Sequence, residues 1–138
     1  MRRERSTLLR LLLIGLFGAL GGTSRVVVGE AAIVGLGWSA PLATATTNIA
    51  GGLLIGLVHA LTLPEGRWPL AEPLRTGVLV GFLGSFTTFS LLSAETFDLL
   101  IAGETVAATL NLFGSLSLAI VAAGLGLAIG QRGSNRSA

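Results

Sequence analysis

The sequence has 138 residues, of which 51% are hydrophobic and only 12% charged, a composition too apolar for a soluble domain of this length. We therefore expect an integral membrane protein. Nine arginines and seven acids give a formal charge of +2, but the arginines stand at the ends of apolar segments rather than on one face, which argues against nucleic acid as a partner. Without cysteine or tyrosine, and with one histidine, the chain is not expected to be an enzyme.

The first predicted membrane span covers about residues 8–28 and follows an arginine-rich N-terminus. A signal peptide begins in the same way. However, the apolar stretch continues past Arg25, and the later spans need an anchored first helix, so we favour a retained span. Arg25 follows Gly21 and Gly22 closely, and on physical grounds alone it is an interfacial arginine whose side chain reaches the headgroups.

The second predicted span covers about residues 42–62 and begins after Pro41. About 21 residues make a helix of roughly 31 Å, which is long enough to cross the hydrocarbon core of a bilayer. Thr44 and Asn48 are four residues apart, so they share a helix face. Because an asparagine at this depth is costly unless it is hydrogen-bonded, two interpretations stay open, an interhelical hydrogen bond and a contact with a ligand.

The third predicted span, about residues 76–98, follows a proline-rich loop, 63–75, and is unusually polar between Gly81 and Glu95 (GFLGSFTTFSLLSAE). An unpaired polar group costs several kcal/mol in hydrocarbon, so such a stretch is expected to face protein or water. We interpret it as a broken helix whose freed backbone groups point at an ion, with a kink that packs without an ion as the alternative. Glu95, near the end of the span, is most simply a solvated carboxylate.

The fourth predicted span, about residues 105–130, contains no charged residue. Asn111 and Ser115 are four residues apart and form a second polar stripe, and the polar tail, residues 131–138, is expected to be disordered. Four spans place both termini on one side of the membrane. That side holds eight of the nine arginines, which predicts cytoplasmic termini.

Taken together, these motifs resemble the small bacterial fluoride channels of the Fluc family. The most specific one is the stretch Gly81–Ser90 (GFLGSFTTFS), closed by Glu95, which is similar to the signature on that family's third helix. The other spans carry weaker similarities, namely Arg25 after two glycines, Thr44 and Asn48 followed by Gly51, and the pair Gly114-Ser115. The resemblance covers roughly residues 18–115.

The resemblance implies an all-α membrane protein with one domain over residues 1–138, four transmembrane helices, a broken third helix, and assembly as an antiparallel dual-topology dimer. It implies passive, fluoride-selective export across the cytoplasmic (inner) membrane, which reduces fluoride toxicity. By matching positions, the fluoride path would be lined by Asn48, Phe89, Ser90 and Ser115, with Thr88, Asn111 and Thr44 as further donors. Backbone carbonyls of Gly84 and Thr87 would hold a structural sodium ion at the dimer interface. Arg25 would act near the entrance of the anion, and Glu95 matches the glutamate of the family's pattern by position.

The sequence departs from the family pattern at two positions. Leu92 stands where a second path-lining phenylalanine is usual, and Asn111 stands where a tyrosine is usual. An asparagine can still donate a hydrogen bond, but a leucine has no ring edge to offer an anion. These replacements would affect the selectivity, the rate or the symmetry of the pore.

The arginine bias suits a single orientation better than dual topology, and a heterodimer with an oppositely oriented paralogue would resolve this conflict. We nevertheless expect an antiparallel homodimer first and that heterodimer second. Two other functions stay open on the sequence. One is a small four-helix, proton-coupled multidrug exporter, which needs a titratable carboxylate inside a span, and the first two predicted spans have none. The other is a non-conducting subunit of a larger membrane complex.

Overall fold

The computed structural model describes the backbone of residues 2–135 and the side chains of residues 6–133. Within that range the chain consists of helices joined by loops. The helical elements are α1 (Arg2–Glu30), η1 (Ala31–Gly35), α2 (Ala40–Leu61), α3 (Glu72–Thr76), η2 (Gly77–Leu83), α4 (Gly84–Phe86), α5 (Phe89–Ile101), α6 (Thr105–Thr109), η3 (Leu110–Gly114) and α7 (Ser115–Asn135). The three η segments are π-helical, which means that their turns are wider than those of an α-helix.

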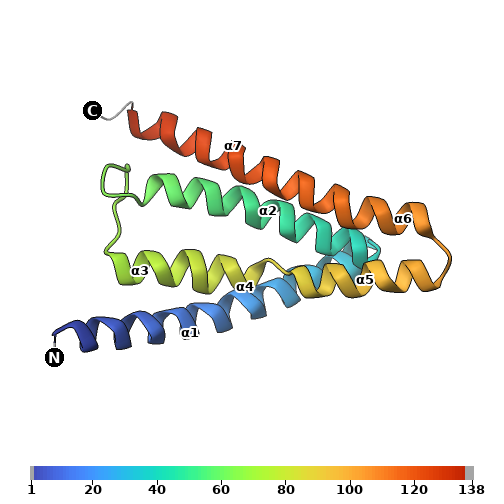
Figure 1. Ribbon diagram of the computed structural model, residues 1–138, viewed down its shortest axis with the longest axis horizontal. Coiled ribbons are helices and arrows are strands. Elements are labelled where there is room, and N and C mark those ends of the chain that lie inside the picture. The colour runs from blue at the N-terminus through green and yellow to red at the C-terminus, as the bar shows by residue number, and fades with distance from the viewer. Residues whose placement is uncertain (1, 136–138) are drawn as a thin grey trace.

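Four helical stretches are long and apolar enough to cross a membrane: Ser6–Gly35, Ala40–Leu61, Glu72–Ile101 and Thr105–Gly133. This confirms the prediction of an all-α protein with four helices able to span a bilayer. The first stretch begins and the last one ends at the same end of the bundle (Figure 1), as an even number of crossings requires. The side chains of Arg2, Arg3, Arg5 and Arg136, which contribute to the predicted arginine bias, lie outside the described residues.

Some helix boundaries differ from the predicted spans. The first helical stretch continues through η1 to Gly35, and the third begins at Glu72, inside the predicted loop, because Pro73 can occupy the first turn of a helix. The fourth continues to Asn135, so residues 131–135 are helical rather than disordered, and the last three residues lie outside the described part. Polar residues can continue a helix beyond the membrane, because the backbone hydrogen bonds of a helix form within the segment itself.

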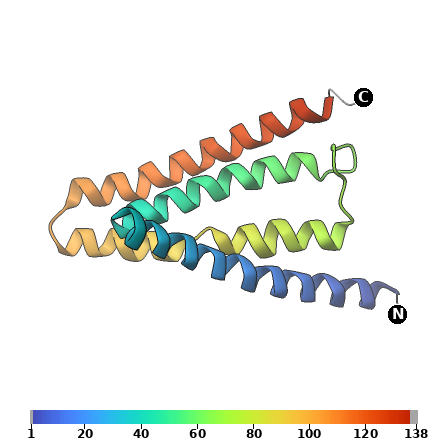
Figure 2. The same ribbon diagram turned by 180° about the vertical axis from the view of Figure 1, so that it is seen from behind.

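Two pairs of helices form the bundle. Figures 1 and 2 agree in placing α1 alongside α3, η2 and α4, and α2 alongside α7, with the partners of each pair running in the same direction. Glycines allow the backbones of both helix pairs to lie close together. A Cβ atom added at Gly52 of α2 would come within 2.5 Å of the Ala119 carbonyl oxygen, and one at Gly81 of η2 within 2.7 Å of the Ile14 carbonyl oxygen. Small residues at these contacts let the backbones pack closely, as is typical of membrane helices.

Candidate functional site

Between α4 and α5 the backbone of Thr87 and Thr88 is extended rather than helical (Figure 1). Thr87 has φ −82° and ψ 155°, and Thr88 has φ −146° and ψ 124°. In a continuous α-helix the Thr88 N–H would donate to the carbonyl of Gly84, four residues earlier. Here the Thr88 N–H donates to a side chain of another helix, so the Gly84 carbonyl is without that backbone partner. We call these two residues the extended segment.

Asn48 of α2 clamps the extended segment. Its Oδ1 accepts a hydrogen bond from the Thr88 N–H at 2.7 Å, and its Nδ2 donates to the Thr88 carbonyl oxygen at 2.8 Å. Both backbone groups of Thr88 are therefore satisfied by one amide side chain, which is only 7% exposed. An interhelical hydrogen bond inside a membrane contributes about 0.6 kcal/mol on average, and up to roughly 1.7 kcal/mol. One hydrogen on Nδ2 is not used by the clamp, because an amide nitrogen carries two.

Thr88 is also the N-cap of α5. Its Oγ1 accepts a hydrogen bond from the Leu91 N–H at 3.2 Å and lies 3.2 Å from the hydroxyl oxygen of Ser90. Such a cap satisfies one of the amide groups that the first turn of a helix leaves unpaired. The N-terminus of α5, which carries a partial positive charge, therefore lies directly beside the Asn48 clamp.

The carbonyl groups on the other side of the extended segment are held differently. The single hydroxyl hydrogen of Thr87 is shared between the carbonyl oxygens of Leu83, at 3.2 Å, and Gly84, at 3.4 Å. The Thr87 N–H also donates to the Leu83 carbonyl, at 3.1 Å. The Gly84 carbonyl thus receives a long hydroxyl bond in place of a backbone amide, and it retains acceptor capacity, since a carbonyl oxygen has two lone pairs.

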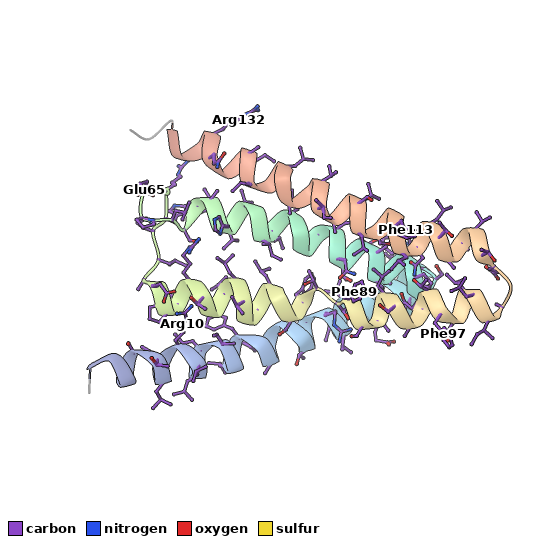
Figure 3. The ribbon with its side chains drawn as sticks, viewed as in Figure 1. Arg10, Glu65, Phe89, Phe97, Phe113 and Arg132 are labelled. Carbon is purple, nitrogen blue, oxygen red and sulfur yellow. The ribbon has the colours of Figure 1, made fainter. Side chains whose placement is uncertain are left out.

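A cavity of about 290 Å³ lies beside the clamp, and we call it the central cavity. It is lined by Asn48, Gly52, Ile55, Thr87, Thr88, Phe89, Leu92, Ser115, Leu116, Ala119, Ile120 and Ala123. Ser115 is 5% exposed, Leu92 is 1% exposed, and the ring of Phe89 is 63% exposed. Figure 3 shows Phe89 at the first turn of α5, in the middle of the molecule. All twelve lining residues are uncharged, so the polar atoms of this cavity are neutral amide, hydroxyl and backbone groups.

A second cavity, of about 210 Å³, lies between α1, α2 and α5, and we call it the Arg25 cavity. Its lining includes the charged residues Arg25, Glu30 and Glu95, together with Thr44, Thr47 and Thr88. Glu95 is 8% exposed, and its Oε1 accepts a hydrogen bond from the Thr44 hydroxyl at 2.7 Å. No described residue donates to its Oε2. Thr88 lines both cavities, so each of them borders the extended segment.

The comparison with known families is decisive for this chain. The family described as CrcB-like protein, Camphor Resistance (CrcB), matches residues 12–127. The chain belongs to this family. The matched residues run from the first apolar helix to the fourth, and they include both cavities and the extended segment.

Similar curated proteins of the CrcB-like family bear the name fluoride-specific ion channel FluC. The one from Magnetococcus marinus is 39% identical over 86% of this chain and 94% of its own length. The one from Syntrophotalea carbinolica is 37% identical over 90% of this chain and 99% of its own length. The one from Geotalea daltonii is 41% identical over 83% of this chain and 91% of its own length. These alignments cover nearly the whole of each relative.

The structure places the predicted site residues of this CrcB-like chain in three groups. Asn48, Thr88, Phe89 and Ser115 line the central cavity, and Arg25, Thr44 and Glu95 line the other cavity together with Thr88. Ser90 is exposed beside Thr88. Asn111 lies outside the lining of the central cavity and donates to the hydroxyl of Thr96 at 3.0 Å. For Asn48, the interhelical hydrogen bond that the sequence left open is present.

Glu95 requires a correction. The sequence favoured a solvated carboxylate near a helix end, but α5 continues to Ile101, which places Glu95 in the middle of that helix and buries it against Thr44. Sequence reasoning also missed Thr47 in the Arg25 cavity and Thr96 as the partner of Asn111. The polar residue Thr47 directly before Asn48 could have indicated that Thr47 belongs to the site. No such signal marked Thr96, a single threonine on α5.

Proposed function

We propose that this CrcB-like chain is a fluoride-selective channel through which fluoride leaves the cell passively across the cytoplasmic membrane. Two findings support the proposal. Relatives of 37–41% identity are named fluoride-specific ion channels. The central cavity is lined by neutral hydrogen-bond donors around the Asn48 clamp. This lining is the structural observation on which the proposal depends.

The chemistry of the central cavity suits a small, strongly hydrated anion. A conducting site must replace the water around the ion with donors, yet bind it weakly enough for the ion to leave. The unused Nδ2 hydrogen of Asn48, the hydroxyl of Ser115 and the positive edge of the Phe89 ring are donors of this kind. A buried arginine would bind the anion too tightly. Ser90 is a further hydroxyl beside Thr88, whereas the single hydroxyl hydrogen of Thr44 is donated to Glu95, so the structure does not leave Thr44 as a donor to the anion.

We infer that the extended segment is a functional break in the third membrane helix. Asn48 takes up both backbone groups of Thr88, which leaves the Gly84 carbonyl available, and Thr87 supplies a second carbonyl one turn away. Oxygen ligands of this type suit a hard cation. The two carbonyls therefore fit the proposed sodium ion, whose part would be to hold two such segments together at a dimer interface, with no role in moving the anion.

An antiparallel dimer is part of the proposal. The Phe89 ring is 63% exposed although it stands beside buried Ser115 and Asn48, so one chain leaves the path open on one side. A second copy in the opposite orientation would bring its own extended segment to the same place. We propose a homodimer first. The charge asymmetry between the two ends favours, as the second arrangement, a heterodimer with an oppositely oriented paralogue.

The orientation can be measured directly, because the chain has no cysteine. The variant Gln131→Cys introduces one thiol at an exposed position on the end that carries both termini. Labelling whole cells with a membrane-impermeant maleimide is expected to modify about half of the chains if the homodimer has dual topology. Modification of all chains or of none would contradict dual topology and support the paralogue arrangement.

Fluoride efflux from liposomes tests the function itself. The purified wild-type chain, reconstituted alone, is expected to release trapped fluoride rapidly, as followed with a fluoride electrode, and to retain chloride. Equal release of both anions would contradict selectivity. Proton-dependent uptake of an organic cation would support the exporter alternative instead. Folded, inserted protein that releases neither anion would indicate a missing partner or a non-conducting subunit, and co-expression with a paralogue separates these two.

A further inference from the structure

Two side-chain hydrogen bonds connect α5 to η3, the segment directly before α7. The carbonyl of Leu92, a residue of α5 that lines the central cavity, accepts a hydrogen bond from the Thr96 hydroxyl at 2.7 Å. The same hydroxyl oxygen accepts a hydrogen bond from Nδ2 of Asn111 in η3 at 3.0 Å. Ser115, which also lines the cavity, stands one helical turn beyond Asn111 and donates its N–H to the Asn111 carbonyl in an ordinary main-chain helix bond. We call the two side-chain bonds the Thr96–Asn111 relay.

Asn111 lies in the π-helical segment η3, and Ser115 follows it as the first residue of α7. In an α-helix, residues four apart share a face, which is the basis on which the sequence predicts a single polar stripe. In the structure the two side chains have different surroundings, since Asn111 donates to Thr96 on α5, while Ser115 lines the central cavity. π-Helical segments such as η3 are frequent at functional sites.

Thr96, the middle residue of the relay, has no hydroxyl hydrogen left to donate to an anion. The single hydroxyl hydrogen of Thr96 goes to the Leu92 carbonyl, and its oxygen accepts from Asn111. Thr96 is 8% exposed, so both bonds form in a dry environment where breaking one leaves a polar atom unpaired. The group that the relay holds is Ser115, which is 5% exposed and lines the cavity opposite Asn48 and Phe89.

We propose that Thr96 and Asn111 are positioning residues for anion conduction, which tether η3 to α5 and thereby keep Ser115, one turn further along, at its place in the central cavity without touching the anion themselves. The inference rests on the proposed function and deepens it. It also gives a role to the asparagine that stands where the Fluc pattern has a tyrosine. In this chain the residue at position 111 acts through Ser115.

A matched pair of substitutions tests the relay. Thr96→Val removes the hydroxyl but keeps the shape of the side chain, whereas Thr96→Ser keeps the hydroxyl. Because one hydrogen bond in a membrane protein changes an equilibrium severalfold, Thr96→Val is expected to slow fluoride efflux about fivefold and Thr96→Ser less than about twofold. Asn111→Leu breaks the relay from the other side and should match Thr96→Val, so it carries the test if Thr96→Val does not fold. Fluoride efflux at the wild-type rate from both Thr96→Val and Asn111→Leu would overturn the proposal.

A double-mutant cycle with Ser115 separates positioning from a general loss of stability. If the relay acts through the Ser115 hydroxyl, Thr96→Val in a Ser115→Ala background is expected to add less than about a twofold loss to that of Ser115→Ala alone. A purely structural role for Thr96 would instead multiply the two losses. That result would overturn the proposal even if Thr96→Val alone is slow.

A third measurement does not depend on fluoride transport. Ser115→Cys introduces the sole thiol of the chain, and its reaction rate with methyl methanethiosulfonate reports how position 115 meets the cavity. Adding Thr96→Val is expected to slow this reaction about fivefold, and adding Thr96→Ser to change it less than about twofold. An unchanged rate in a chain that does conduct fluoride would overturn the relay. A slowed rate in a chain that does not conduct would keep the positioning contact and overturn the proposed function.

Discussion

The central cavity and the Arg25 cavity share the lining residue Thr88 but differ in the charge of their linings. The central cavity is lined by uncharged groups around the Asn48 clamp, whereas the other is lined by one arginine and two acids as well as hydroxyl groups. Figure 3 shows Phe89, which lines the central cavity, at the middle of the molecule, away from Arg10, Glu65 and Arg132 at the end that carries the termini. Charged side chains line the Arg25 cavity and are absent from the described lining of the central cavity.

We propose that the Arg25 cavity attracts the anion and that the central cavity conducts it. A charge acts over distance and raises the local concentration of an anion, but in a water-poor cavity it would bind that anion strongly. Neutral donors act only on contact and bind weakly. The comparison therefore predicts that adding a charge to the central cavity stops conduction, whereas removing a charge from the Arg25 cavity only changes its rate.

The largest expected effect comes from a charge placed in the central cavity. Asn48→Asp replaces the amide by a carboxylate and removes the donor to the Thr88 carbonyl. Repulsion between two unit charges 4 Å apart is about 4 kcal/mol at an effective dielectric constant of 20, so fluoride efflux is expected to fall more than about 100-fold. The same substitution at Asn135, beyond the fourth span, is the matched control and should leave efflux within about twofold. Wild-type efflux from Asn48→Asp would exclude the central cavity from the path.

A smaller effect, dependent on salt, is expected at Arg25. Arg25→Gln removes the positive charge of the Arg25 cavity, and efflux at about 20 mM salt is expected to fall roughly threefold. At about 500 mM salt the difference should disappear, because ions then screen charges beyond a few ångströms. Arg25→Lys keeps the charge and should keep the salt dependence of the wild type. A loss of equal size at both salt concentrations would show that Arg25 acts through structure rather than attraction.

The smallest effect is expected at Glu95. Glu95→Gln removes a negative charge from the Arg25 cavity but retains an oxygen that can accept from the Thr44 hydroxyl. Efflux at low salt is therefore expected to rise, by less than about twofold, with the melting temperature of the purified protein little changed. Glu95→Leu, which also removes the acceptor, should lower the melting temperature. A strong loss of efflux in Glu95→Gln with normal stability would place Glu95 on the path itself.

Composition and local chemistry make part of this structure predictable from the sequence. Four apolar stretches predict four membrane helices, and hydroxyl groups between Gly81 and Ser90 single out the segment where Thr87 and Thr88 are extended. The mutual contacts of these residues could not be predicted, because the clamp joins residues 40 apart in the chain. The relay could not be predicted for a similar reason, because the bond between Asn111 and Thr96 joins residues 15 apart on two different helices.

One electrical measurement tests fluoride selectivity most directly. Wild-type protein is fused into a planar bilayer with a tenfold fluoride gradient, an opposite chloride gradient and equal pH on both sides, and the zero-current voltage is recorded. A fluoride-selective path predicts a voltage of about 59 mV with the sign set by fluoride. A voltage that follows chloride, or a voltage near zero, would contradict a channel selective for fluoride.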